Sequence, residues 1–494
     1  MNRTVRVCVM IVSASLLSVG AMLIAGPLNP PAGPVAPTYK TLVEVEPRVA
    51  VNATNTPGSA GAVFRITQAG SYYLTGNVIA PAGSSAVIEI IVSGVSLDLG
   101  GFLISGAGIA QNGVRTTAGV QGVKITNGFI SGCLSHGVTA PGTYAEIESV
   151  NSSLCAGNGI DVGAFARVRG CATRGNSSHG IRVGSNSIVA DCITSSNVGN
   201  GIEALSGTSV IDCVCEGNGV GMLLYSFCSA SNCRVSNPGA AGSIGFQSFI
   251  GESGVTLTEC RVSGGGRGYW FQGGKMTLTR CSASGLTGGQ TAFEIGPNSL
   301  LSECRADNNS GHGFLLFPRC HAANCAATQN AADGFNSLGA GAGSFVNCTA
   351  TGNTGNGFNL SDGATVQGCT ANDNLSRGIS MNNGGSVINC TTRNNQSDGI
   401  AVNFSCLVRG NSCNGDGTGI GFEAAVRATG QANRIEGNNI TFADRGILVS
   451  SGGNTIFGNS LKGCVLNFDI AGGNDTGPIG NAASATSPWA NIQY

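Results

Sequence analysis

The sequence is poor in charge, in aromatic side chains and in proline. Of its 494 residues, 10% are charged, 6% are aromatic and 14 are Pro. The 25 Lys and Arg nearly balance the 26 Asp and Glu, so the net charge is −1. A chain without a basic excess is not expected to bind nucleic acid electrostatically. The scarcity of Pro and the lack of Gly at every third position exclude collagen.

Long helices are also missing from the pattern. No stretch of ten or more residues has helical spacing of apolar side chains, and 79 residues are Gly, far above the usual share of about 7%. Gly disfavours helix interiors. Disorder is excluded because 41% of the residues are hydrophobic. The composition therefore predicts an all-β chain of many short strands joined by Gly turns.

The N-terminus predicts export. Arg3 and Arg6 precede an apolar run over residues 7–26, which is typical of a secretory signal peptide. The run has 26 − 7 + 1 = 20 residues, enough to span a bilayer at about 1.5 Å per residue, so residues 1–26 could stay as an uncleaved anchor. Residues 27–39 form a Pro-rich spacer. We expect a secreted, periplasmic or cell-surface protein that contacts a membrane only through an uncleaved N-terminus.

Three kinds of residue recur with one period. Cysteines recur most often every 21 residues, Asn follows many of these cysteines by five residues, and Gly-Ile or Gly-Phe steps keep the same spacing. The repeating cysteines are Cys171, Cys192, Cys213, Cys233, Cys260, Cys281, Cys304, Cys325, Cys348, Cys369, Cys390 and Cys413. The Asn series is Asn176, Asn197, Asn218, Asn309, Asn330, Asn353, Asn374 and Asn395.

A repeat of about 22 residues made of short strands and turns is the rung of a parallel β-helix. We predict a single-stranded β-helix solenoid of roughly 16–19 rungs over residues 85–470, with successive rungs about 4.8 Å apart. Equivalent residues then stack in columns, with the Cys, Ile, Val and Phe facing inward. Because exposed ends of such a stack would recruit other strands, residues 40–84 are expected to form an N-terminal cap and residues 471–494 a C-terminal cap or tail.

With these repeats, the chain resembles the right-handed parallel β-helix, or pectate-lyase-like, superfamily. The resemblance rests on the Asn and Gly-Ile repeats of residues 85–470 and on the opening Val95-Ser96-Leu97-Asp98-Leu99-Gly100-Gly101-Phe102, which is similar to the first rungs of exported bacterial members. It implies right-handed coiling and a location outside the cytoplasm. It implies no single activity, because this fold serves lyases, hydrolases, isomerases, adhesins and tail-spike-like proteins.

The cysteine column predicts buried free thiols. Cα atoms on successive rungs lie about 4.8 Å apart, within bridging distance, but the Cβ vectors run parallel and a thiol packs well as a small apolar group. A few bridges among cysteines outside the column remain open. Zinc is not expected, since the chain has no Cys-x-x-Cys pair and no His cluster at ligand spacing.

The outward position after the Gly-Ile step gives the candidate catalytic site. Asp161, Arg182 and Glu203 would stack as acid, base and acid, with the carboxylates about 9.6 Å apart, near the separation of an inverting glycosidase pair. Alternatively, Arg182 abstracts a proton in a lyase while the acids hold Ca²⁺; no other cofactor and no dedicated metal site is predicted. The simpler interpretation is that alternating charges stabilise neighbouring strands.

The same row continues with Gln247, Trp270 and Glu294, where Trp270 would stack on a sugar ring. The Gly311-His312-Gly313 and Ser178-His179-Gly180 segments resemble part of a polygalacturonase site, but that family's Asp-Asp pair and Arg-Ile-Lys are missing. The Trp-x-Asp-His motif of pectate lyases is missing as well.

Two functions follow from these patterns. The first is a non-catalytic, structural rod that binds a polysaccharide or cell-surface glycan. The second is a polysaccharide lyase or glycoside hydrolase that works in an extended groove on one β-helix face. The missing catalytic signatures favour the rod.

Overall fold

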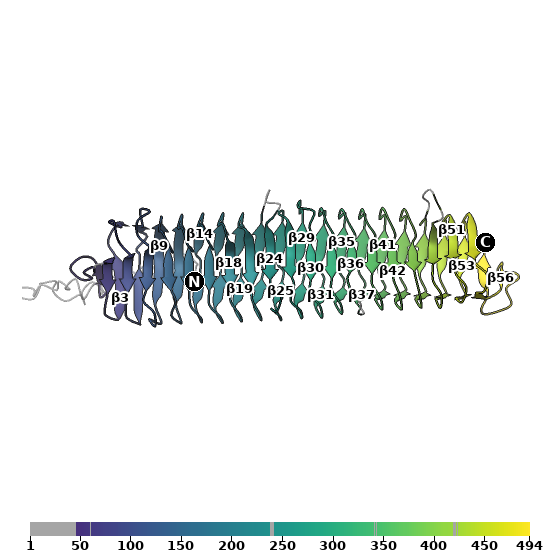
Figure 1. The fold of residues 1–494 in the computed structure, drawn as a ribbon, viewed down its shortest axis with the longest axis horizontal. Helices are drawn as coiled ribbons and strands as arrows, with labels where there is room; N and C mark the ends of the chain where they lie inside the picture. Colours follow the sequence, from purple (N-terminus) through teal and green to yellow (C-terminus); the bar gives the residue numbers. More distant parts are fainter. Residues whose placement is uncertain are drawn as a thin grey trace, which may run out of the picture. The chain divides into compact units, whose positions relative to one another are not determined.

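Three short strands and three sharp corners make up each coil of the protein. The computed structural model describes residues 46–59, 61–237, 242–339, 341, 343–417, 421 and 423–494. The predicted signal peptide and spacer lie outside these residues. Contacts divide the chain into Met1–Arg48 and Val49–Tyr494, and the second unit holds the coils. Figure 1 shows the coils following one another along one axis from purple to yellow.

The strands form three parallel ladders that run along the unit. The first ladder contains β2 (Ala62–Ile66), β5 (Ala86–Ile90), β8 (Asn112–Thr116), β10 (Val138–Ala140), β12 (Ile160–Val162), β15 (Ile181–Val183), β18 (Asn200–Ala204), β21 (Val220–Leu224), β24 (Ile244–Ser248), β27 (Arg267–Phe271), β30 (Phe293–Ile295), β33 (Phe314–Leu316), β36 (Phe335–Ser337), β39 (Phe358–Leu360), β42 (Ile379–Met381), β45 (Ile400–Val402), β48 (Ala424–Ala428), β51 (Arg445–Val449) and β54 (Leu466–Ile470).

The second ladder follows the first within each coil. It contains β1 (Val49–Val51), β3 (Gly70–Leu74), β6 (Val95–Asp98), β9 (Lys124–Ser131), β11 (Glu146–Ser153), β13 (Arg167–Arg169), β16 (Ile188–Ala190), β19 (Ser209–Ile211), β22 (Ser229–Ser231), β25 (Thr256–Thr258), β28 (Thr277–Thr279), β31 (Leu300–Ser302), β34 (His321–Ala323), β37 (Ser344–Val346), β40 (Thr365–Gln367), β43 (Ser386–Ile388), β46 (Leu407–Arg409), β49 (Arg434–Glu436), β52 (Thr455–Phe457) and β55 (Asp475–Thr476).

The third ladder completes the coil, and the long strands β9 and β11 belong to both the second and the third. It also contains β4 (Val78–Ile79), β7 (Leu103–Ser105), β14 (Ala172–Arg174), β17 (Ile193–Ser195), β20 (Val214–Glu216), β23 (Arg234–Ser236), β26 (Arg261–Ser263), β29 (Ser282–Ser284), β32 (Arg305–Asp307), β35 (Ala326–Thr328), β38 (Thr349–Thr351), β41 (Thr370–Asn372), β44 (Thr391–Arg393), β47 (Ser412–Asn414), β50 (Asn439–Thr441), β53 (Ser460–Lys462), β56 (Ile479–Gly480) and β57 (Asn491–Gln493).

This architecture confirms the predicted all-β, parallel solenoid, with about 20 turns of about 21 residues. Stacked pairing reaches beyond residues 85–470 at both ends: Val49 pairs with Tyr72 and Ala62 with Ala86, while β57 pairs with β53 near the C-terminus. The described residues contain no helix, hence none that is long and apolar enough to cross a membrane.

Many corners are turned by a residue in the left-handed region, followed by a small inward side chain. Asp191 (φ 56°) and Asp212 (φ 52°) take this conformation, which Asp, Asn and Gly tolerate best. The next residues, Cys192 and Cys213, are fully buried. Their thiols donate to the main-chain oxygens of Ala190 and Ile211, at 3.1 and 3.2 Å. The predicted column is therefore a stack of buried, hydrogen-bonded thiols.

The prediction that Cys413 belongs to the cysteine column is wrong. Cys413 lies in the middle of β47, in register with Thr392 and Ile440. Asn411 takes the column position next to Cys390, whose main-chain N–H it accepts at 2.8 Å. The Cys-to-Cys spacing misleads here because an inward position within a strand and one at a corner are only two residues apart.

The predicted Asn column is confirmed as a hydrogen-bonded ladder. Asn197 receives a bond from Asn176 Nδ2 at 2.9 Å and donates one to Asn218 at 2.9 Å. A second run passes from Asn309 to Asn395 and ends at Asp416, which accepts from Asn395 Nδ2 at 2.8 Å. Because these amides are buried, each satisfied bond avoids the cost of a buried unpaired polar group.

Aromatic rings fill the middle of the coil interior. Six rings of the first ladder lie face to face along the axis, with centroids 4.5–5.2 Å apart. They are Phe246, Tyr269, Phe293, Phe314, Phe335 and Phe358, all fully buried. Coil spacing and stacking distance coincide, so the same repeat that pairs the backbone also packs the rings.

We expect the cysteines to resist alkylation in the native protein. Eighteen of the 19 described cysteines are buried, and Cys464 is partly exposed. Burial raises the pKa of Cys215, and that of Cys320 to about 11, which disfavours the reactive thiolate. Mass spectrometry after N-ethylmaleimide treatment should show Cys464 modified first among the described cysteines, and the 18 buried ones only in denaturant. Native modification of the column, or thiols missing after denaturation without reductant, would contradict the free-thiol stack.

A second prediction concerns Asp416, which lies in the position of a ladder Asn. Burial raises the pKa of Asp416 to about 6 from an ordinary value of 3.8, so its stabilising contribution is complete below pH 4 and falls as the pH rises through 6. Asp416→Asn should raise the free energy of unfolding at pH 7.5 by up to about 3 kcal/mol, with no gain at pH 4. Asn218 shows that an amide fits, since its Nδ2 donates to the Thr194 main-chain oxygen at 3.1 Å.

Denaturant unfolding of the two proteins at pH 4 and pH 7.5 measures this difference. The exposed Asp373, two coils away, provides the control Asp373→Asn, which should change stability little at either pH. An equal effect of both substitutions would contradict the role of burial.

Candidate functional site

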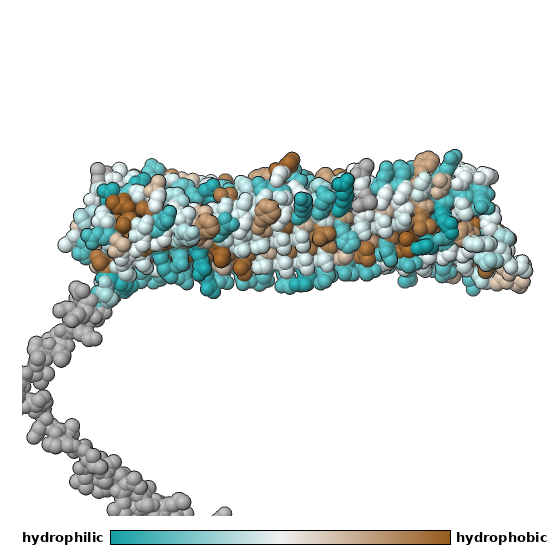
Figure 2. All heavy atoms as spheres, turned by 90° about the horizontal axis from the view of Figure 1, so that it is seen from below, coloured by the Kyte–Doolittle hydropathy of each residue, from teal (hydrophilic) through white to brown (hydrophobic). Residues whose placement is uncertain are grey.

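The next-to-last residues of the first-ladder strands point outward and stack from coil to coil. Asp161 is in register with Arg182, and Arg182 with Glu203. Gln247 is in register with Trp270, and Trp270 with Glu294. The structure therefore brings together each predicted group of three. Figure 2 shows a largely hydrophilic to neutral surface with separate apolar patches on one face of the molecule.

Arg182 lies between the two predicted carboxylates. Its Nη1 is 3.2 Å from Asp161 Oδ1 and its Nε is 3.6 Å from Glu203 Oε1. Burial opposes the charge on Arg182, but the two carboxylates outweigh it and raise the pKa of Arg182. A guanidinium held this way keeps its proton, and it occupies the place between the acids where a cation would bind. The arrangement is an alternating charge ladder.

Two histidines lie next to the row of Asp161, Arg182 and Glu203. His179 accepts a bond from the Asn200 main-chain N–H at Nδ1, 3.0 Å away, and its Nε2 is 3.0 Å from Glu203 Oε2. Because Nδ1 accepts, Nε2 carries the proton that reaches the carboxylate. His136 is placed alike, with Nε2 4.0 Å from Asp161. Histidines at the turn position before Gly thus contact the carboxylates of the outward row.

Trp270 is already engaged by its neighbours. The guanidinium carbon of Arg267 lies 4.4 Å from the centroid of the indole, and the indole Nε1 donates to Glu294 at 3.1 Å. Arg267 also pairs with Glu294 at 3.1 Å. One face of the predicted sugar platform is therefore covered by a cation.

Further carboxylates of this face are held in the same way. Asp398 is fully buried and pairs with Arg377 at 3.1 Å and Arg427 at 2.8 Å. Asp333 accepts amide bonds from Asn336 and Asn359, both at 3.1 Å. Asp333 and Asp398, in the turns that precede first-ladder strands, thus bond to side chains of neighbouring coils.

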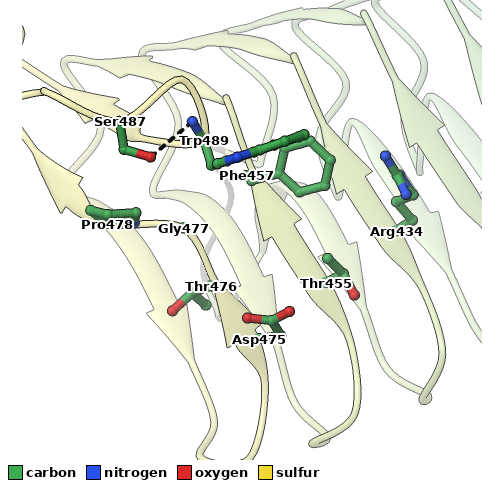
Figure 3. A pocket seen from close by; sticks show the side chains of 9 residues that line it. All are labelled: Arg434, Thr455, Phe457, Asp475, Thr476, Gly477, Pro478, Ser487 and Trp489. Carbon is green, nitrogen blue, oxygen red and sulfur yellow. Dashed lines mark hydrogen bonds between the residues drawn. The ribbon is translucent and has the colours of Figure 1, made fainter.

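An aromatic pocket lies near the C-terminus. Figure 3 shows Trp489 and Phe457 on one side of it and Thr455, Thr476 and Asp475 on the other. The pocket has a volume of about 450 Å³. Three consecutive second-ladder strands provide its outward row of Arg434, Thr455 and Asp475, which are in register.

The chain folds back over these strands to complete the pocket. A Cβ at Gly477 would lie 1.9 Å from the main-chain oxygen of Trp489, so only Gly allows this approach. Beyond Trp489, Asn491 accepts the main-chain N–H and Nδ2 of Asn459 at 3.1 and 3.0 Å. The inward ladder therefore anchors the segment that carries the exposed indole.

A groove lined by arginines lies on the third ladder, at the corner next to the Cys column. Its volume is about 520 Å³, and Arg234, Arg261, Arg280, Arg305, Glu303 and three serines line it. We call it the arginine groove. Arg234 is in register with Arg261, and Ser282 separates Arg261 from Arg305. The short Ser282 side chain leaves the hollow between its long neighbours.

The sequence patterns did not lead to a prediction of either the aromatic pocket or the arginine groove. Arg234, Arg261 and Arg305 each directly follow a column cysteine, so the period could have revealed this row. The aromatic pocket has no such signal, because Trp489 lies in the non-repeating end of the chain. Among the described residues, no three His, Cys, Asp or Glu gather as metal ligands.

Comparison with known protein families supports the coiled fold. Residues 214–374 and 319–411 match the family model described as the right handed beta helix region. No curated protein matches the sequence.

Several solved structures resemble the fold. The A-module of mannuronan C-5 epimerase AlgE6 from Azotobacter vinelandii is 11% identical, with 86% of this chain and 91% of that chain covered and a TM-score of 0.21. The Siphovirus 9NA tailspike receptor binding domain is 10% identical, with coverage of 89% and 80% and a TM-score of 0.34. The catalytic unit of a GH87 alpha-1,3-glucanase from Streptomyces thermodiastaticus is 10% identical, with coverage of 90% and 68% and a TM-score of 0.24. These matches concern the coiled fold alone and say nothing about the activity of this chain.

The stacked parallel coils, together with the family model matched over residues 214–411, show that this chain has the fold of a right-handed parallel β-helix.

Proposed function

We propose that this protein is an exported or cell-surface rod that binds an acidic polysaccharide in the arginine groove without cleaving it. The observation that carries the proposal is a pair of exposed arginines on adjacent coils. Arg234 and Arg261 have no carboxylate partner within the described part of the chain, and both line the groove. Guanidinium groups bind carboxylate and sulfate oxygens through paired hydrogen bonds.

The other arginines of the groove are paired but accessible. Arg280 lies 2.9 Å from Glu259, with 49% of its side chain exposed, and Arg305 lies 3.5 Å from Asp307, with 60% exposed. Exposed ion pairs of this kind contribute little to stability, so an incoming anion can share these guanidinium groups. Glu303 also lines the groove and contributes one negative charge to it.

The repeat favours a linear ligand. Arg234 and Arg305 are three coil steps apart, about 14 Å at 4.8 Å per step, so anionic groups spaced along a chain can each meet a guanidinium. A nucleic acid is disfavoured, because no aromatic side chain lines the groove to stack on bases. Ser263, Ser282 and Ser284 offer hydroxyls to sugar oxygens.

The acidic side chains on the face of the first ladder are held in ion pairs, which supports a non-catalytic role. Asp161, Glu203, Glu294 and Asp398 are each paired with an arginine of the same face. A location outside the cytoplasm, as a secreted, periplasmic or surface protein, is proposed from the signal-peptide pattern of residues 1–26.

Binding assays with polygalacturonate, alginate and neutral dextran test the groove. We expect both acidic polymers to bind, with affinity falling as salt rises, because screening shortens from about 10 Å at 0.1 M to about 3 Å at 1 M. The double variant Arg234→Gln/Arg261→Gln should bind at least tenfold more weakly. Arg167→Gln/Arg174→Gln removes the same charge from β13 and β14, outside the groove, and should bind as the parent does. Equal binding by both double variants, or no binding of acidic polymers, would overturn the proposal.

A polysaccharide lyase or hydrolase that uses Asp161, Arg182 and Glu203 is the alternative function. The contact of His179 with Glu203 favours it, since a histidine and a carboxylate can share a proton in general acid–base catalysis. Ca²⁺, the candidate cofactor of such an enzyme, would have to displace the Arg182 guanidinium from its place between the acids.

The same incubations, assayed for new reducing ends and unsaturated products, separate the two functions. We expect no cleavage of acidic or neutral polysaccharides. Cleavage that Glu203→Gln abolishes, while the variant still binds the polymer, would establish the enzyme and refute the non-catalytic rod.

A further inference from the structure

The C-terminal pocket has two chemically different walls. On one side stand Phe457 and Trp489, whose rings meet at 77° with centroids 5.0 Å apart, and Trp489 is 57% exposed. On the other side lie Asp475 and the hydroxyls of Thr455 and Thr476 (Figure 3). An apolar ring face opposite hydrogen-bonding groups suits a ligand with one C–H face and a rim of hydroxyls.

The free charge in this pocket is negative. Arg434 donates to Glu436 at 2.6 Å, and its guanidinium carbon lies 4.8 Å from the centroid of Phe457. Glu436 therefore balances the charge of Arg434, and the Asp475 carboxylate is left in excess. The exposed Asp475 carboxylate has no hydrogen-bond or ion-pair partner anywhere in the described ranges. A free carboxylate accepts hydrogen bonds from hydroxyl or amine groups and repels an anion.

We propose that the pocket binds a terminal sugar unit that carries no acidic group, either neutral or an amino sugar. Its C–H face packs on the indole of Trp489, and its hydroxyls donate to Asp475 and exchange hydrogen bonds with the threonines and Ser487. The volume of about 450 Å³ lies within the range of small-molecule sites, roughly 300–1,000 Å³.

The pocket is preformed by the fold. Ser487 Oγ accepts the Trp489 main-chain N–H at 3.2 Å, and the Asn459–Asn491 bonds fix the chain just beyond the indole. Little ordering is therefore required when a sugar binds. This inference does not depend on the arginine groove, because the two sites lie on different ladders and select opposite charges.

The composition allows a direct test, since the chain has only two Trp. In a Trp270→Phe background, Trp489 is the sole indole and its fluorescence reports on the pocket alone. Titration with glucose, galactose, mannose, glucosamine or N-acetylglucosamine should change its emission saturably for at least one of these sugars, with little effect of salt in the case of a neutral sugar. Glucuronic acid should leave the emission unchanged.

Asp475→Asn in the same background should weaken binding of that sugar about tenfold, because a charge-assisted hydrogen bond is lost. Asp469→Asn is the matched control: it removes a carboxylate from β54 on the first ladder, where Asp469 pairs with Arg445 at 2.8 Å, and should titrate as the parent does. No response to any of the five sugars, a response to glucuronic acid alone, or an unaltered Asp475→Asn titration would overturn the proposal. Polymer binding by the groove can succeed or fail independently of this result.

Discussion

Registry between successive coils is the constraint on which the whole molecule depends. Each inward side chain must find its equivalent about 4.8 Å away along the axis, and the interior is built of groups that bond or pack well at that spacing. Amides donate to amides, thiols stack at the corners, and phenyl rings lie face to face. Any group that lacked a partner at this distance would leave a cavity or an unsatisfied polar atom in every coil it entered.

Registry also governs the outer surface. Like charges on neighbouring strands would face each other at the coil spacing, so the outward row alternates acid with base, as in Asp161, Arg182 and Glu203. Where the acid lies deeper, as Asp398 does, two arginines from adjacent coils enclose it.

The two proposed binding surfaces lie where outward charges have no opposite charge beside them or where the repeat ends. In the arginine groove, a serine replaces an arginine of the row and leaves a hollow flanked by cations. At the C-terminal end, a non-repeating segment adds an exposed indole to three repeating strands. In the two proposals made above, the first surface would bind anionic groups spaced along the axis and the second a hydroxyl-rich sugar unit.

The sequence by itself determined the coil, the ladder of Asn, the buried thiols and the register of both predicted outward trios, because a residue's place in a repeating coil depends only on its position within the period. Tertiary structure decided what the period does not encode. It placed Asn411 rather than Cys413 in the column, brought His179 to Glu203, and covered Trp270 with Arg267. It also formed the aromatic pocket, since Gly477 and Asn491 guide a segment that has no repeat to copy. Side-chain reach across coils and the path of a chain end depend on contacts in space, which spacing along the sequence does not specify.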